Sequence, residues 1–219
     1  MFALAVLVMV TLACSFTTVN TPTAQPPTVV TGPQILFQDD FSATNSGWDR
    51  ATDDSYSSDY ENGGYRINIV PANYSAFANP YQSFQNDVRL EVDATKIAGP
   101  DDNNAFGVIC RYQDVDNYYY FYVSSDGYVG IGMDNAGTKS IISSSDGYLT
   151  SVSGINSGSA INHIRADCIG SALTLYVNGT RVATASDGTF TGGDIGLVAR
   201  TYEVAGTDIQ FDNIFVYKP

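Results

Sequence analysis

Basic residues are scarce in this sequence of 219 residues, in which ten lysines and arginines stand against 23 aspartates and glutamates. The resulting formal net charge of −13 repels phosphate backbones and anionic lipid headgroups. We therefore expect no nucleic-acid partner, and a membrane contact only through a covalent lipid anchor. Glutamate and lysine are rarer than glycine and tyrosine, which favours turns and strands over helices.

Catalytic and metal-binding motifs are also missing. The single histidine, His163, has no Gly-x-Ser-x-Gly motif to accompany it, and one histidine with two cysteines that are expected to pair with each other leaves no zinc ligand set. We interpret His163 as a residue on the surface of a strand. The single tryptophan, Trp48, is expected to pack over an edge of the domain, with a ligand platform as the alternative.

Hydrophobic runs long enough to span a membrane are absent. The apolar stretch from Met1 to Ala13 is shorter than the roughly 20 residues of a spanning helix, which favours a signal peptide. A small residue followed by Cys14 resembles a bacterial lipobox, although Thr11 stands where leucine is usual. We predict a signal peptide with lipobox over residues 1–14 and an exported protein, anchored at the cell surface or envelope through lipid on Cys14. An ordinary signal peptide is the alternative.

Charge is absent from the next segment. Residues 15–34 are rich in threonine and proline and show neither a strand period nor a helix period, which predicts a disordered linker. We expect one folded domain over residues 35–219, because all-β domains of this length commonly form a single unit.

Helical periodicity is absent from the folded part, whereas apolar and polar residues alternate throughout. From Asn162 to Arg200 the pattern predicts four consecutive antiparallel strands, with tight turns at Asn178-Gly179 and Asp187-Gly188. Similar patterns make thirteen strand candidates: 35–41, 65–70, 75–81, 88–97, 105–112, 118–124, 128–133, 140–143, 161–169, 172–178, 181–185, 195–201 and 208–217. The sequence therefore predicts an all-β, two-sheet antiparallel sandwich.

The two cysteines of the folded part form an even pair. Alternation places the side chains of Cys110 and Cys168 on the apolar faces of their strands. In an exported protein this arrangement predicts a disulfide, and two buried free thiols are the alternative.

Several segments, in order, resemble a known superfamily. They are QDDFSATNSGWD near the start, FGVICRYQDVDNYYYFYVSSDGYVGIGM, NHIRADCIGSALTLYVNG, and IQFDNIFVY at the end. Together they are similar to concanavalin A-like (laminin G-like) jelly rolls, in particular the family 16-like and 3-keto-disaccharide hydrolase-type domains of bacterial exported proteins. The resemblance covers about Ile35 to Tyr217 and implies a jelly-roll fold and sugar binding. Fold alone does not fix function, because this superfamily hosts several roles.

The resemblance also provides a test for hydrolase activity. Family 16 glycoside hydrolases resemble one another in a Glu-x-Asp-x-x-Glu triplet, which supplies the two carboxylates of retaining chemistry. The nearest match begins at Glu91 and Asp93 but has Lys96 in place of the third acid. We interpret Glu91 and Asp93 as the solvated face of a strand, and leave a hydrolase with a different acid pair as an alternative.

Aromatic residues are concentrated in one strand. Alternation places Tyr118, Tyr120 and Tyr122 on one face, where they could meet Arg111 of the preceding strand and contact sugar. Arg165 could join the same groove. Packing within the sheet is the alternative for the tyrosines.

A structural calcium ion is the cofactor that the resemblance implies, and none is required by the sequence itself. In jelly rolls of this type the ion lies where the first and last strands meet, which here brings in Asp40 and Asp212. Solvated acidic turns are the alternative. As a whole, the sequence favours a cell-surface, lectin-like carbohydrate-binding lipoprotein with a glycan as partner, over a hydrolase or a structural or protein-binding envelope module.

Overall fold

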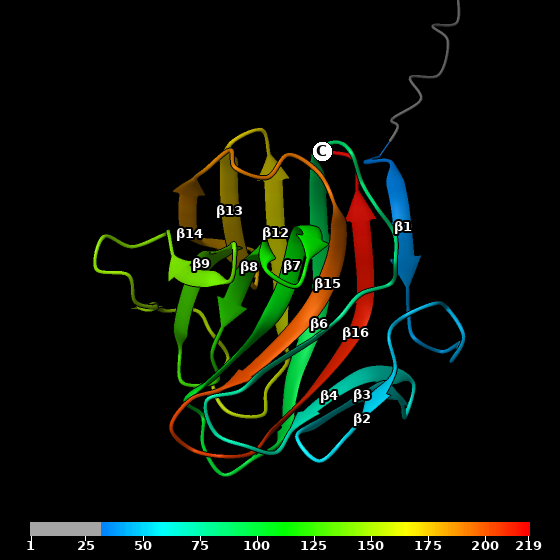
Figure 1. Ribbon diagram of the computed structural model, residues 1–219, viewed down its shortest axis with the longest axis vertical. Helices are drawn as coiled ribbons and strands as arrows, with labels where there is room; N and C mark the ends of the chain where they lie inside the picture. The colour runs from blue at the N-terminus through cyan, green and yellow to red at the C-terminus, as the bar shows by residue number, and fades with distance from the viewer. Residues whose placement is uncertain (1–31) are drawn as a thin grey trace, which may run out of the picture. The chain divides into compact units, whose positions relative to one another are not determined.

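The computed structural model describes residues 32–219, which form two antiparallel β-sheets packed face to face (Figure 1). This arrangement confirms the all-β jelly-roll prediction. The predicted signal peptide, Cys14 and nearly all of the predicted linker lie outside the described residues. Within the described part of the chain, no helix is long and apolar enough to cross a membrane.

The larger sheet has nine strands in the order β14-β13-β12-β6-β16-β4-β3-β2, with β1 also paired to β16. Its central strands β6 and β16 are eleven residues long each and pair antiparallel. The strands are β1 Ile35–Asp39, β2 Ala51–Thr52, β3 Tyr56–Glu61, β4 Gly64–Ile69, β6 Val88–Ala98, β12 Asn162–Ile169, β13 Ala172–Val177, β14 Thr180–Ser186 and β16 Thr207–Tyr217.

The smaller sheet has seven strands in the order β10-β9-β8-β7-β15-β5, with β11 also paired to β9. Its strands β7, β8, β9 and β15 lie in front of the larger sheet in Figure 1. The strands are β5 Ser75–Ala78, β7 Asn104–Asp114, β8 Asn117–Val123, β9 Tyr128–Asn135, β10 Thr138–Ile141, β11 Thr150–Ser151 and β15 Asp194–Thr201.

The hydrophobic core fills the space between the two sheets. Alternate residues of β6, from Val88 to Ala94, point into it from the larger sheet, and Tyr119, Phe121 and Val123 of β8 point into it from the smaller one. The opposite face of β8 carries Tyr118, Tyr120 and Tyr122, which belong to a second, smaller apolar cluster on the outside of the smaller sheet. The strand alternation read from the sequence therefore holds along β8.

A disulfide joins the two sheets across this core. Cys110 lies on β7 of the smaller sheet and Cys168 on β12 of the larger one, and both are fully buried. The predicted bridge is confirmed. Trp48 also packs as expected: its ring lies 5.4 Å from that of Phe41, and its Nε1 donates a hydrogen bond to Asp39 at 2.9 Å.

The strand predictions differ from the structure in two respects. All thirteen predicted segments overlap strands, but β2, β3 and β11 were not predicted, because β2 and β11 have two residues each and β3 is mostly polar. The four strands from Asn162 to Arg200 also divide between the sheets. Three of them, β12 to β14, form a meander in the larger sheet, whereas β15 crosses to the smaller sheet and pairs with β7 and β5.

Candidate functional site

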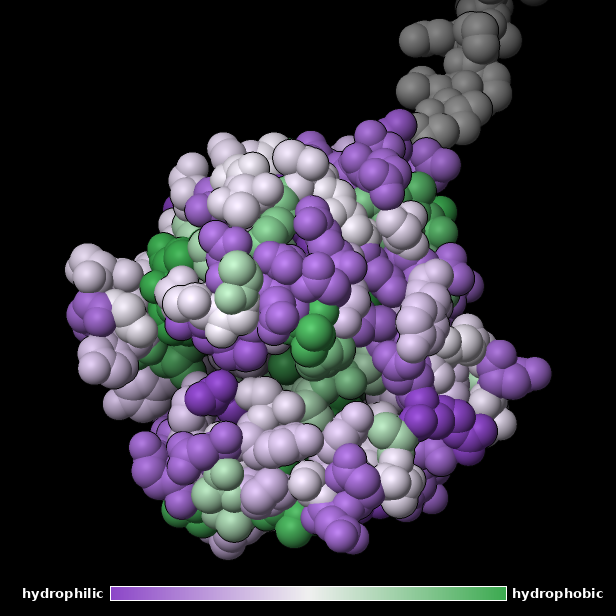
Figure 2. Space-filling view, viewed as in Figure 1, coloured by the Kyte–Doolittle hydropathy of each residue, from purple (hydrophilic) through white to green (hydrophobic). Residues whose placement is uncertain are grey.

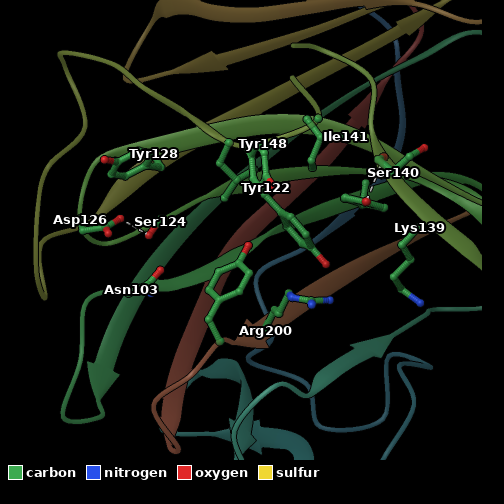
Figure 3. Close-up of a pocket in the computed structure, with 14 residues that line it drawn as sticks. Asn103, Tyr122, Ser124, Asp126, Tyr128, Lys139, Ser140, Ile141, Tyr148 and Arg200 are labelled. Carbon is green, nitrogen blue, oxygen red and sulfur yellow. Dashed lines mark hydrogen bonds between the residues drawn. The ribbon is translucent and has the colours of Figure 1, made fainter. Parts of the chain in front are cut away.

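A pocket of about 600 Å³ opens on the outer face of the smaller sheet (Figure 3). Its walls come from β8, β10, β15 and the start of β9, from the turn before β7, and from the segments that follow β8, β10 and β15. Figure 2 shows this side of the molecule as mostly hydrophilic, with small apolar areas in a hollow near the centre. The lining residues are Asn103, Tyr120, Tyr122, Ser124, Asp126, Tyr128, Lys139, Ser140, Ile141, Gly147, Tyr148, Leu149, Arg200 and Tyr202.

Glycines let two tyrosine rings form the floor of this pocket. Tyr120 pairs with Gly132 of β9, and Tyr122 pairs with Gly130 of β9 on one side and Gly107 of β7 on the other. A Cβ atom at Gly132 would lie 2.2 Å from the Tyr120 ring, which shows that the ring rests directly on the glycine backbone. A glycine in a strand commonly marks such a close approach.

The floor tyrosines are too buried to stack on a ligand. Tyr118, Tyr120 and Tyr122 are each 3% exposed, and the ring centres of Tyr120 and Tyr122 are 4.6 Å apart. Burial raises the pKa of all three phenols. Tyr118 lies beyond the pocket lining. The geometry thus corrects the expectation that these three rings present flat faces to a sugar, because the rings are buried and pack against one another at tilted angles.

Exposed aromatic rings come instead from the turns that flank the pocket. Tyr148, in the segment between β10 and β11, is 73% exposed, and Tyr128 at the start of β9 is 42% exposed. Figure 3 shows both on the side of the pocket opposite Arg200. These two rings are the ones that a ligand can contact over a large area.

Arg200 supplies a positive charge to the pocket from β15. Its Nη1 donates a hydrogen bond to the Ser75 hydroxyl at 3.1 Å, and its guanidinium lies 5.1 Å from the centre of the Tyr202 ring. The side chain is half-buried, and it points toward the space beneath Tyr122 (Figure 3). Within residues 32–219, no carboxylate lies within ion-pair distance of it.

A second cation in the pocket, Lys139, is neutralised from below. Its Nζ lies 2.6 Å from a carboxylate oxygen of Asp134, which is fully buried on β9. The same Nζ is 6.0 Å from the centre of the Tyr118 ring. A buried carboxylate strongly favours a charged partner, so Lys139 is held at the sheet by this pair.

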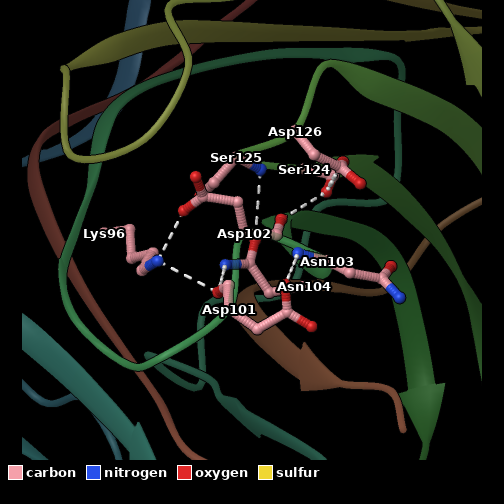
Figure 4. A network of polar contacts seen from close by, with 8 residues as sticks. All are labelled: Lys96, Asp101, Asp102, Asn103, Asn104, Ser124, Ser125 and Asp126. Atoms are coloured by element: carbon pink, nitrogen blue, oxygen red, sulfur yellow. Dashed lines mark hydrogen bonds and ion pairs between the residues drawn. The ribbon is translucent and has the colours of Figure 1, made fainter. Parts of the chain in front are cut away.

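One end of the pocket is fixed by a polar network (Figure 4). Lys96 donates to the Asp101 carbonyl at 3.0 Å and to the Asp102 carboxylate at 2.5 Å, and Ser124 donates to the Asp102 carbonyl at 3.1 Å. The turn before β7 is thereby tied to the turn after β8. Asn103 and Asp126, which line the pocket, are positioned by these two turns.

Arg111 lies away from the pocket, contrary to the sequence expectation. Its backbone φ is +55°, at a bulge in the pairing of β7 with β8, so strand alternation fails and the side chain turns toward the end of the larger sheet. There it is 3% exposed and donates to the carbonyls of Gly170, Phe190 and Cys168 at 2.8, 2.9 and 3.2 Å. Its position is structural.

Arg165 lies on the other sheet, so it cannot share a groove with the tyrosines of β8. It sits on the outward face of β12, where it bonds the Asp167 carboxylate at 2.6 Å and lies 4.3 Å from the centre of the Tyr176 ring. Sequence alternation found its face correctly, but the sheet to which the strand belongs depends on topology.

The partial acid motif is also on the larger sheet. Glu91 and Asp93 point outward from β6, and His163 on the neighbouring strand β12 lies 2.8 Å from Asp93 through Nδ1. This surface arrangement agrees with the interpretation of all three residues as the solvated face of strands. Lys96 points inward and serves the network of Figure 4.

The expected calcium ligands lie near the pairing of β1 with β16. Asp40 follows β1 and accepts hydrogen bonds from Ser42, which lower its pKa; the pKa of Asp212 on β16 is raised, first by burial and then by the charges of Asp93 and Asp40. Within residues 32–219, no group of three or more His, Cys, Asp or Glu side chains is arranged to hold a metal ion. A calcium site would therefore need carbonyl oxygens, and it stays a prediction.

The sequence missed four residues that define the pocket: Arg200, Lys139, Tyr148 and Tyr202. Only Arg200 carried a usable signal, because in Gly196-Leu197-Val198-Ala199-Arg200 it alternates with the core residues Leu197 and Ala199 and must face outward. The place of Lys139 depends on how β10 pairs with β9, and those of Tyr148 and Tyr202 depend on how the segments after β10 and β15 fold over the sheet.

Comparisons with solved structures agree on the fold. The chain is similar to a carbohydrate-binding module, CBM66, from Bacillus subtilis, with 20% identity and a TM-score of 0.59 over 78% of this chain and 96% of that one. It is similar to a β-glucanase from Bacillus licheniformis, with 12% identity and a TM-score of 0.60 over 84% and 98% of the two chains. An endo-β-galactosidase from Clostridium perfringens matches with 11% identity and a TM-score of 0.60 over 90% and 65%. No protein-family model and no curated protein matches the sequence. The described chain therefore has the jelly-roll fold that these structures share.

Proposed function

We propose that this domain binds carbohydrate in the pocket on the outer face of the smaller sheet. The observation that carries the proposal is the composition of the pocket, in which the exposed rings of Tyr128 and Tyr148 are combined with charged, amide and hydroxyl side chains in about 600 Å³. Aromatic faces contact the apolar faces of sugar rings, and polar groups bond their hydroxyls. The carbohydrate-binding and glycosidase structures of the same fold support a carbohydrate-related role at the level of the fold.

Binding is favoured over hydrolysis by the acids available in the pocket. Among the described residues that line it, Asp126 is the one carboxylic acid, and it accepts a hydrogen bond from Ser124. Hydrolysis of a glycosidic bond by two carboxylates needs a pair, on either side of the bond. Glu91 and Asp93 lie on the other sheet, so they cannot supply the second acid.

The test is a glycan array followed by calorimetry of the glycans that bind. Tyr148→Ala removes the most exposed ring of the pocket and should weaken binding roughly 3- to 10-fold, the size of one aromatic contact. Tyr81→Ala is the matched control, because Tyr81 is 74% exposed and lies outside the pocket lining. Equal weakening by both variants, or the absence of any bound glycan, would contradict the proposal; the second result would favour a structural or protein-binding role.

We also propose that the protein is exported and anchored by lipid at Cys14. The apolar segment before Cys14 supports this proposal, as does the disulfide between Cys110 and Cys168, since such bridges persist in oxidising compartments outside the cytosol. Mass spectrometry of the protein extracted from membranes of the producing cell tests it. A mature chain without acyl groups on Cys14 would contradict the anchor.

A further inference from the structure

We propose that the pocket prefers a sugar that carries a carboxylate, a uronic acid residue, and that Arg200 is the group that recognises it. This inference rests on the proposed function and specifies the class of ligand. The side chain that carries it is the one half-buried cation of the described chain that has no acidic partner.

The basic residues of the chain show how unusual this is. All ten lie in the described part, and seven of them form ion pairs with carboxylates of the protein. Of the other three, Arg181 and Lys218 are exposed to solvent, whereas Arg200 is half-buried in the pocket. The protein has 23 acidic residues, and in the described part of the chain none of their carboxylates lies within ion-pair distance of the Arg200 guanidinium.

The surroundings of Arg200 aim the guanidinium at the pocket. Nη1 bonds the hydroxyl of Ser75 on the neighbouring strand β5, and the Tyr202 ring covers one face of the group at 5.1 Å. Nε and Nη2 of Arg200 donate no hydrogen bond to another described residue, so these donors are available to a ligand. Figure 3 shows the group extending into the space between Tyr122 and Lys139.

A carboxylate suits these donors better than a hydroxyl does. The guanidinium is a planar fork whose parallel N–H groups match the two oxygens of a carboxylate, and such charged pairs are stronger than neutral hydrogen bonds. Taking an unpaired charge out of water is unfavourable, and a ligand of opposite charge offsets that penalty on binding. Lys139 does not compete for the ligand's charge, because Asp134 already neutralises it.

The other acidic side chains near the pocket form no ion pair with Arg200. Asp126 accepts from Ser124, and Glu203, next to Tyr202 in the chain, accepts from Asn103 at 3.2 Å. Asp126 and Asn103, the partner of Glu203, both belong to the end of the pocket where the network of Figure 4 is found. A uronate bound at Arg200 would therefore place its neutral ring toward the exposed tyrosines.

The experiment compares two matched probes by calorimetry: trigalacturonate and its fully methyl-esterified form, with trimannuronate and its ester as a second pair. About 150 mM salt limits the reach of the protein's net charge to roughly 8 Å. The intact protein should bind at least one free acid about 10- to 100-fold more tightly than its ester, the size of hydrogen bonds to charged groups. Arg200→Gln should abolish that preference, and Arg200→Lys should restore only part of it.

Arg181→Gln is the control, because it removes the same charge from an exposed arginine outside the pocket, and it should keep the preference for the free acid. Equal affinity for acid and ester, or a preference that survives Arg200→Gln in a variant that melts like the wild type, would overturn the inference. If neutral glycans bind in a Tyr148-dependent way and uronates do not bind better, carbohydrate binding stands and the uronate preference falls. Binding of no glycan at all would overturn both.

Discussion

Replacement of Arg111 by methionine should destabilise the domain without acting on the pocket. Methionine has a similar length and no donors, so the change removes the guanidinium and leaves its partners in place. The carbonyls of Phe190 and Cys168 accept hydrogen bonds from Arg111 in buried surroundings, and each buried acceptor left without a partner costs about 1–3 kcal/mol. The Gly170 carbonyl and the 43% exposed Asp87 carboxylate can turn to water and contribute little.

We therefore expect Arg111→Met to lower the free energy of unfolding by about 3–5 kcal/mol, as in other buried charged networks that lose one partner. Urea unfolding followed by tyrosine and tryptophan fluorescence measures this change. Arg50→Met is the matched control, since its guanidinium pairs with Asp59 at the surface, where both side chains are exposed, and it should cost less than about 1 kcal/mol. Equal losses in the two variants, or a loss below about 1 kcal/mol for Arg111→Met, would refute the structural role assigned to Arg111.

Three further predictions concern the disulfide, a buried acid and calcium. Replacing Cys110 and Cys168 together by alanine opens a loop of 58 residues and should lower the free energy of unfolding by about 4 kcal/mol in urea titrations; an unchanged urea midpoint would count against this. Burial raises the pKa of Asp194 to about 6, so the folded state retains a proton that the unfolded chain releases near 3.8. The contribution of Asp194 to the free energy of unfolding should thus fall as the pH rises from about 4 to about 6. Asp194→Asn should remove that part of the pH dependence. Parallel plots of unfolding free energy against pH for the two proteins would show that Asp194 titrates normally. If calcium binds near Asp40 and Asp212, the melting temperature should be lower in excess chelator than in calcium, and Asp212→Asn should abolish the difference. Equal melting temperatures with calcium and with chelator would contradict the calcium site.

Strand alternation accounts for most of what the sequence predicted correctly. It placed Tyr119 and Phe121 in the core, and it oriented Cys110 and Cys168 toward each other across the sandwich. Such predictions need only the two-residue period of a strand and the knowledge of which face is apolar, and both can be read from neighbouring residues. The packing of Trp48 was equally local, because a large apolar ring at the start of the domain is most stable when buried.

The failures came from features that depend on non-local structure. Arg111 adopts a positive φ without being glycine, so the bulge that turns its side chain has no signature in the sequence. Arg165 was assigned to the wrong sheet because the partners of β12 are β6 and β13, whereas those of β8 are β7 and β9. The pocket itself required the segment around Tyr148 to fold over the sheet.

The glycines beneath the tyrosine floor give the domain a means of changing what it accepts. A methyl group at Gly132 would displace the Tyr120 ring, and one at Gly130 would meet Leu149 at 2.5 Å. Either change would raise the floor or shift the wall while leaving Arg200, Tyr128 and Tyr148 untouched. The depth of the pocket and its charge are thus set at separate positions, so a substitution at either glycine changes the space for a ligand and leaves the charge of Arg200 in place.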